Sequence, residues 1–248
     1  MVKSIIGVLT LVGLTLVFFF FFVGAPRVSR EQQLFLSPPY VYGNPGQSIE
    51  DIEIVALYFV PKDRQDAQIS GWFELLLGSL QELQKFHELQ FLGRSQIGYR
   101  IYPEPVIGEE GHATYDIPDL DHANPERLSA LQREVAARID KNTTTGNAYR
   151  VFVVMYEGIG ATGADQIALL SRVFFTEEKY QPLTDTFLAH EFYHALSVPD
   201  HYQRSAKVFD DGQLVSVEIL SSEDLMGRVR VPLEKTYLDK STRKQMGL

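Results

Sequence analysis

The sequence predicts an α/β (α+β) domain, in which two backing helices and a third, histidine-bearing helix cover a twisted, mostly parallel sheet. Apolar or alternating runs at 52–60, 97–102 and 149–156 have the length of strands in a core. Amphipathic helical segments separate these runs. Strands that alternate with helices form parallel sheets, because each helix returns the chain to the same end of the sheet.

An apolar N-terminal segment precedes the domain. Residues 5–23 carry no charge and include five consecutive phenylalanines. About 20 apolar residues in a helix cross the hydrocarbon layer of a bilayer. We therefore expect residues 1–25 to form a transmembrane signal-anchor. The alternative is a cleaved signal peptide, but Pro26 directly after the small residue Ala25 should hinder cleavage.

The charges around this segment concern its orientation and its partners. Lys3 precedes the segment, and Arg27 and Arg30 follow it, so the positive charges are nearly balanced. A short tail before a large domain is typical of an exported domain, so we expect an extracytoplasmic location, or secretion if the segment is cleaved. The net charge of −9 argues against a nucleic-acid partner. The chain has no cysteine, so disulfides do not bear on its location.

Residues 26–50 are rich in proline and glycine and lack a sustained period, which predicts a linker. The folded domain is expected over 51–248, with its first strand at 52–60. A helix is expected over 69–91, where apolar residues recur at intervals of three and four, and His87 is expected to mark its end. The next strand, 97–102, ends at Pro103.

The second half of the domain continues the alternation. Asn124 and Pro125 are typical of a helix start, and this helix is expected to reach residue 140. Strands are expected at 149–156 and 169–176, and the second is a candidate edge strand for pairing with an extended substrate. The glycine-rich residues between these strands are expected to form a flexible connection. A last helix begins near Thr184.

This last helix leads into a cluster of titratable residues, "HEFYHALSVPDHY" at 190–202. His190 and His194 are four residues apart, so on a helix they lie on one face, one turn apart. Two imidazoles in this arrangement bind zinc, and Glu191 is placed to act on a metal-bound water. The other positions are apolar nearly all round, which predicts a buried helix whose polar groups need partners. One Zn²⁺ would supply them.

A third ligand is expected shortly after the helix. Pro199 disfavours helical geometry in the residue before it, so the chain turns and Asp200 can return to the metal. Three protein ligands and a water form the open arrangement of a catalytic zinc site. His201 is an alternative third ligand. Some peptidases with this helix motif use a later glutamate instead, for which Glu218 and Glu223 are candidates.

The pattern His190-Glu191-x-x-His194-x-x-Ser197-x-x-Asp200 resembles the extended zinc motif of the metzincin metalloproteases, in the variant whose third ligand is aspartate. "VPDHY" followed by "DLMG" is similar to snapalysin-type peptidases and, less closely, to immune-inhibitor-A-type peptidases. The resemblance is sharp over 190–226 and architectural over 50–189. It implies a metzincin-like zincin domain, Asp200 as the third ligand, and Met226 in a methionine turn under the zinc.

The chain departs from the family at Ser197, where a glycine is usual. If this turn needs a positive φ, serine costs roughly 1 kcal/mol relative to glycine. Ser197 lies in the loop that would bring Asp200 to the metal, so this departure bears on the loop's geometry and on the reach of Asp200.

The resemblance implies a zinc-dependent endopeptidase that acts on protein or peptide substrates, and the apolar N-terminal segment is expected to anchor it to a membrane. Zinc would polarise the scissile carbonyl and lower the pKa of its water, while Glu191 passes the water's proton to the leaving amine. The resemblance also places a tyrosine at Tyr202, a candidate for stabilising the oxyanion, although a packing tyrosine is the alternative. The rival function is a non-catalytic, zinc-stabilised, membrane-tethered binding module with the same ligands.

Overall fold

Strand β1 (Ser48–Val60) lies inside the sheet and pairs with neighbours on both of its edges. Its continuous apolar run explains this position, because a strand covered on both faces needs apolar residues at every position. The computed structural model describes residues 48–117, 125–139, 148–164, 166–208, 214–227 and 231–246. All of them belong to one compact unit of the chain, Pro38–Leu248.

The sheet is mostly parallel, which confirms the prediction. Hydrogen-bonded neighbours follow the order β2-β1-β4-β6-β5, and the short strand β3 also pairs with β1. All pairings are parallel except that between β5 and β6, which is antiparallel. The strand bounds are Gln96–Ile101 for β2, Val106–Ile107 for β3, Ala148–Tyr156 for β4, Ala161–Ala164 for β5 and Ile167–Ser171 for β6.

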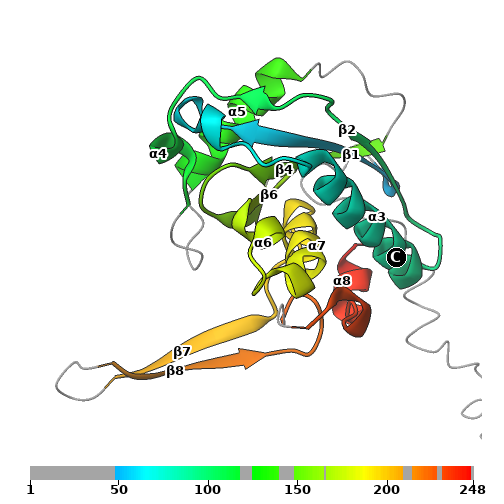
Figure 1. The fold of residues 1–248 in the computed structure, drawn as a ribbon. Helices are drawn as coiled ribbons and strands as arrows, with labels where there is room; N and C mark the ends of the chain where they lie inside the picture. Colours follow the sequence, from blue (N-terminus) through cyan, green and yellow to red (C-terminus); the bar gives the residue numbers. More distant parts are fainter. Residues whose placement is uncertain are drawn as a thin grey trace, which may run out of the picture. The chain divides into compact units, whose positions relative to one another are not determined.

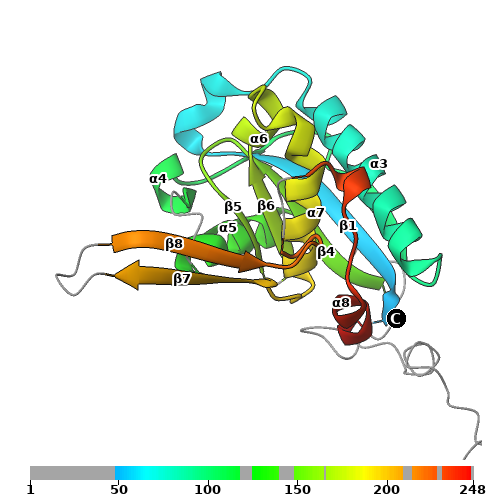
Figure 2. The same ribbon diagram turned by 90° about the horizontal axis from the view of Figure 1, so that it is seen from below.

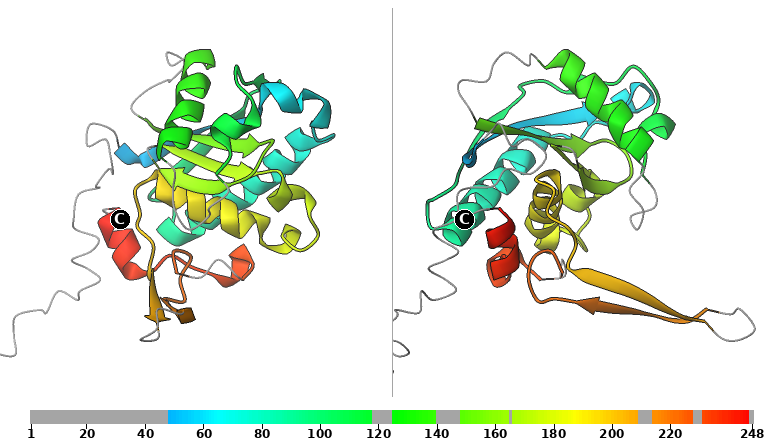
Figure 3. Two further views of the ribbon diagram at one scale, coloured as in Figure 1. Left: turned by 90° about the vertical axis from the view of Figure 1, so that its left-hand side faces the viewer. Right: turned by 180° about the vertical axis from the view of Figure 1, so that it is seen from behind.

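Helices cover both faces of this sheet (Figures 1 and 3). Helix α5 (Pro125–Arg138) lies on one face, whereas α3 (Trp72–Phe91) and α7 (Thr184–Ala195) lie on the other. Because side chains alternate along a strand, β1 contributes to two separate cores. One core lies against α3 and α7 and takes Ile54, Ala56 and Tyr58; the other lies against α5 and takes Val55, Leu57 and Phe59.

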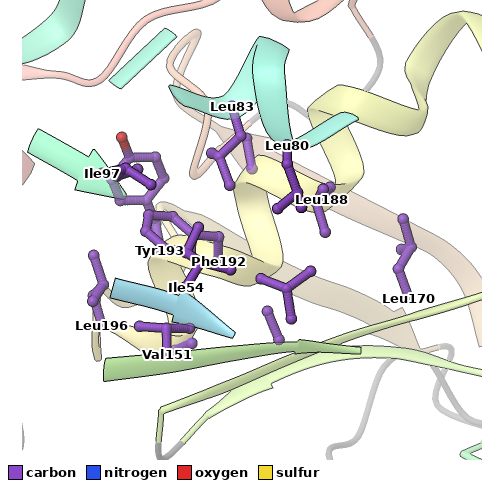
Figure 4. Packing of buried hydrophobic residues seen from close by; sticks show 14 of the residues in the cluster. Ile54, Leu80, Leu83, Ile97, Val151, Leu170, Leu188, Phe192, Tyr193 and Leu196 are labelled. Carbon is purple, nitrogen blue, oxygen red and sulfur yellow. The ribbon is translucent and has the colours of Figure 1, made fainter. Parts of the chain in front are cut away.

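The core between the sheet and the two helices holds α7 in place. Leu80 and Leu83 of α3 meet Leu188 and Phe192 of α7 in this core (Figure 4). All four side chains are completely buried. Packing against α3 and the sheet therefore holds α7, the predicted histidine-bearing helix, in place without a metal.

After α7 the chain forms an antiparallel hairpin of β7 (Tyr202–Val208) and β8 (Leu214–Ser221). The hairpin is a separate two-stranded sheet that extends away from the helices (Figures 1 and 2). The remaining described elements are short: 3₁₀ turns η1 (Lys62–Ala67), η3 (Gln181–Leu183) and η4 (Leu233–Lys235), and helices α4 (His112–Tyr115), α6 (Val173–Thr176) and α8 (Lys240–Gln245).

Three local predictions are wrong. The strand expected at 169–176 is β6 only to Ser171, and the short helix α6 follows it. β6 is also not an edge strand, because β5, within the stretch expected to be a flexible connection, pairs along its outer side. His87 does not mark a helix end; it lies within α3 and is completely buried. In each case tertiary pairing or packing decided against the local pattern.

The N-terminal predictions fall outside the described residues. These predictions are the anchor at 1–25 and the linker at 26–50, of which only the last three residues are described, as the start of β1. Within the described ranges, no helix has both the length and the apolar character needed to cross a bilayer.

Candidate metal centre

Helix α7 carries the predicted histidines into the core. It packs against α3, β5 and β6, and nine of its twelve residues are buried. His190 is 6% exposed and Glu191 is 8% exposed. Burial of this kind is costly for polar side chains unless each finds a partner.

The helix ends in a turn that reverses the chain. The Ser197 amide donates to the carbonyl of His194 (2.8 Å), and the Val198 amide donates to that of Tyr193 (3.0 Å). Ser197 has a φ of +64°, so the helix ends in a Schellman motif with serine at the left-handed position. The turn therefore does need a positive φ, the condition under which serine is less favourable here than glycine. Pro199 follows Val198, and the chain returns toward α7 with Asp200, whose Oδ1 lies 3.1 Å from Nε2 of His194.

The two histidines are held in one tautomer by main-chain carbonyls. Nδ1 of His190 lies 3.1 Å from the carbonyl oxygen of Leu225, and Nδ1 of His194 lies 2.7 Å from that of Val198. A carbonyl only accepts, so each Nδ1 carries the hydrogen and donates it. In the neutral rings, both Nε2 atoms are then left with free lone pairs. Metal-binding histidines are commonly oriented by this kind of hydrogen bond.

The Nε2 lone pairs and one carboxylate oxygen converge. The two Nε2 atoms lie 3.0 Å apart, and Oδ1 of Asp200 lies 3.4 Å from Nε2 of His190 and 3.1 Å from that of His194. Ligands about 2.05 Å from a tetrahedral zinc are separated from one another by about 3.3 Å. The spacing and the donor types therefore fit a divalent cation such as zinc.

The ionisation of these groups reflects burial and mutual contact. Burial raises the pKa of Asp200, but hydrogen bonds and charge from His190 and His194 outweigh it, so this pKa lies well below its usual value. Burial lowers the pKa of His194, but Asp200 and Glu191 outweigh it, so this pKa lies above its usual value. A proton on His194 is thus held more strongly than on a free histidine, and a bound cation would replace it.

Glu191 is not one of the three residues whose potential ligand atoms converge. Burial raises the pKa of its carboxyl group, the charges of His190 and His194 oppose this effect, and Asp200 adds to it. A carboxylate whose pKa is raised by burial beside a metal site suits a group that accepts and returns a proton.

The predicted methionine turn lies next to this cluster. Met226 is completely buried, and its neighbour Leu225 supplies the carbonyl that holds His190. The main-chain amide of His201 donates to the carbonyl of Met226 (3.0 Å). The segment 222–227 therefore contacts both the histidine helix and the loop that carries Asp200.

Of the two adjacent candidates for the third ligand, the structure brings Asp200 to the histidines. His201 instead faces Asp224, with Nδ1 2.8 Å from Oδ2. His201, Asp224 and Asp239 form a second group whose potential ligand atoms lie within 4.8 Å of one another. Glu223 is exposed and belongs to neither group found among the described residues. The side chains of Tyr202 and Glu218 are outside the described part of the structure, so their roles remain predictions.

Comparisons with known proteins assign neither fold nor function. No protein-family model matches the chain, and no curated protein matches it. A solved structure that matches is the Argonaute protein from Methanocaldcoccus janaschii in complex with guide DNA, at 6% sequence identity and a TM-score of 0.30. The match covers 76% of this chain and 26% of the Argonaute chain. A similarity this low supports no argument, so the site is judged on its own geometry.

Sequence reasoning missed three residues that shape the site. Asp224 precedes Met226 by two positions, and only the fold brings it to His201. Gly163 lies where β5 crosses α7. His87 forms a hydrogen bond with the hydroxyl of Tyr193 on α7, with 2.9 Å between Nδ1 and Oη. His87 was detectable as a polar residue on the apolar stripe of α3, and Asp224 begins the "DLMG" motif, although nothing local indicated its partner; Gly163 carried no local signal.

Proposed function

We propose that this chain is a zinc-dependent endopeptidase of the metzincin type, with His190, His194 and Asp200 as zinc ligands. One observation carries the proposal. Two Nε2 lone pairs and a carboxylate oxygen converge at 3.0 to 3.4 Å, while both Nδ1 hydrogens are engaged by carbonyls. Such a convergence of electron pairs is repulsive unless a cation or a proton lies between them.

The chemistry requires a fourth, open position. A bound Zn²⁺ would act as a Lewis acid on a carbonyl and lower the pKa of a water. Three protein ligands leave the fourth coordination position of a tetrahedral zinc open, whereas a closed structural site has four protein ligands. The second group of possible ligands contributes no fourth donor to the first.

Glu191 is the proposed general base and acid. Its carboxylate would accept a proton from the attacking water and deliver that proton to the nitrogen of the departing amine. Burial raises its pKa, which brings it closer to the range in which a carboxyl group both takes and gives a proton near neutral pH. Tyr202 is proposed to donate a hydrogen bond to the oxyanion, on the basis of the resemblance.

The proposed substrate is an extended peptide paired with strand β5. β5 pairs with β6 on one side and ends the sheet order on its other side, and it crosses the histidine helix directly. An extended peptide added to a free strand edge gains main-chain hydrogen bonds regardless of its sequence. A peptide on β5 would thus be held near Glu191. In the proposed setting, residues 1–25 anchor the domain to a membrane, and the domain lies on the extracytoplasmic side.

The test uses the purified full chain and the Glu191→Gln variant. We expect about one equivalent of zinc in both proteins by elemental analysis, and cleavage of a mixed peptide library by the wild type alone. The matched control is Glu223→Gln, which removes an exposed carboxylate from the methionine-turn segment and should retain zinc and activity. Cleavage by Glu191→Gln would remove this residue from the mechanism. Zinc without turnover in the wild type would favour the binding module.

A further inference from the structure

The side chains of His201 and Asp224 form a partly buried contact between two segments of the candidate metal site. Nδ1 of His201 lies 2.8 Å from Oδ2 of Asp224, and Oδ1 of Asp224 accepts from the hydroxyl of Ser222. Asp224 is completely buried. A buried carboxylate depends strongly on partners such as these, because an unpaired buried charge is costly.

Main-chain hydrogen bonds flank this contact on both sides. The amide of His201 donates to the carbonyl of Met226 (3.0 Å), and the amide of Ser222 donates to the carbonyl of His201 (3.2 Å). His201 is thus joined to the 222–227 segment at three points. Since His201 directly follows Asp200, these contacts restrict where the Asp200 carboxylate can point.

The same segment holds a second ligand. The carbonyl of Leu225, next to Asp224, accepts the Nδ1 hydrogen of His190 (3.1 Å). The amide of Leu225 in turn donates to the carbonyl of Tyr237 (2.8 Å). One segment therefore contacts His190 directly and is linked to Asp200 through His201.

The contact between His201 and Asp224 has the geometry of a hydrogen bond. The 2.8 Å between Nδ1 of His201 and Oδ2 of Asp224 is an ordinary hydrogen-bond distance. The nearby Asp239 is also engaged, because its Oδ1 accepts from the amide of Thr242 (2.6 Å) at the start of α8.

We propose that Asp224 is a positioning residue that acts through the His201 side chain to hold Asp200 within reach of the metal. Asp200 needs such support, because its side chain is 35% exposed and lies on a loop beyond the end of α7. Loss of an outer partner of a metal ligand typically weakens metal binding by roughly 10- to 100-fold. The inference rests on the proposed metal site.

The test is a double-mutant cycle on the full chain, with zinc affinity measured by competition with a chromophoric chelator. Asp224→Ala and His201→Ala keep all three ligands, and each should weaken zinc binding by roughly 10- to 100-fold. The double variant should bind zinc within about twofold of either single variant, because both changes break one contact. Thermal unfolding of the metal-free proteins reports separately on the fold.

The control is Asp116→Asn, which perturbs another buried carboxylate. Asp116 accepts from the hydroxyl of Tyr156 (2.8 Å) and the amide of Ile159 (2.9 Å), and Tyr156 belongs to the core on the α5 face of the sheet. This variant should lower the unfolding temperature and leave zinc affinity unchanged. If Asp224→Ala does not fold, Asp224→Asn and His201→Gln complete the same cycle with side chains of similar size.

Four outcomes would overturn the inference. Zinc affinity unchanged by Asp224→Ala would make Asp224 structural only. Additive losses in the double variant would show that Asp224 does not act through His201. A second zinc equivalent, lost with Asp224→Ala, would make these residues ligands. No zinc binding by the wild type would remove the proposed function and this inference together, whereas the first three outcomes leave the proposed function standing.

Discussion

Gly163 and Glu191 lie so close that their main chains touch where strand β5 crosses helix α7. A Cβ atom at position 163 would overlap the carbonyl group of Glu191, with 2.7 Å to its carbon, and would lie 2.7 Å from Cβ of His194. Real Cβ atoms do not approach other atoms this closely. The absence of a side chain at Gly163 therefore sets the distance between the sheet and the two residues at the centre of the candidate site.

Gly163→Ala is expected to move the histidine helix away from β5. The added methyl group meets main-chain atoms that cannot rotate aside, so we expect destabilisation of about 1 to 3 kcal/mol and weaker zinc binding. Urea unfolding and chelator competition measure the two effects. Gly98→Ala is the matched control, because a Cβ there meets only the carbonyl oxygen of Ile52, at 4.0 Å. Equal effects of the two changes would contradict the close approach as the cause.

Ser197→Gly is expected to stabilise the protein by about 1 kcal/mol. Ser197 has a φ of +64°, a conformation that glycine adopts without the Cβ clash of other residues. Denaturant unfolding measures the change. Ser197→Ala serves as control: it removes the hydroxyl, keeps the Cβ and should not stabilise. Stabilisation by alanine of the same size as by glycine would locate the effect in the hydroxyl rather than in the backbone.

His87 is expected to make the protein less stable in acid. Burial lowers its pKa from 6.5 to about 3, so it is neutral in the folded state, between Tyr193 and Ser95. The unfolded chain takes up a proton below pH 6.5, and stability present above that pH is lost as the pH falls toward 3. The loss between pH 6.5 and 4.5 should be about 2 to 3 kcal/mol.

The comparison that checks this prediction is the unfolding free energy against pH for wild type and His87→Gln. Glutamine does not titrate, so the variant should be less stable at pH 7 and show a shallower decline between pH 6.5 and 4.5. Parallel curves for the two proteins would mean that other groups cause the acid sensitivity.

Chelation is expected to lower the unfolding temperature, and more so at pH 8 than at pH 6. A metal present at 100 times its Kd adds about 2.7 kcal/mol to stability. The pKa of His194 lies above its ordinary 6.5 in the metal-free protein, mainly because Asp200 outweighs burial, so protons compete with the metal near neutral pH. The raised pKa stabilises the metal-free fold at low pH, and this contribution fades as pH rises. Scanning calorimetry with and without chelator at both pH values tests the sign.

Much of the fold was readable from local patterns. The apolar runs that predict strands at 52–60, 97–102 and 149–156 correspond to β1, β2 and β4, and the periodic segments correspond to α3, α5 and α7. The candidate site was readable for the same reason. His190 and His194 share a helix face through a four-residue spacing, and Pro199 predicted the turn that returns Asp200.

Strand β5 was not readable, because its four residues, ATGA, have no apolar period and become a strand only by pairing with β6. The role of Asp224 was equally hidden, since its partner His201 is 23 residues away. The sequence by itself determined which side chains offer metal-binding atoms, because helix and turn geometry act over a few residues. Only the tertiary structure decided how those atoms are held, because Leu225, Asp224 and Gly163 reach the site through contacts between distant segments.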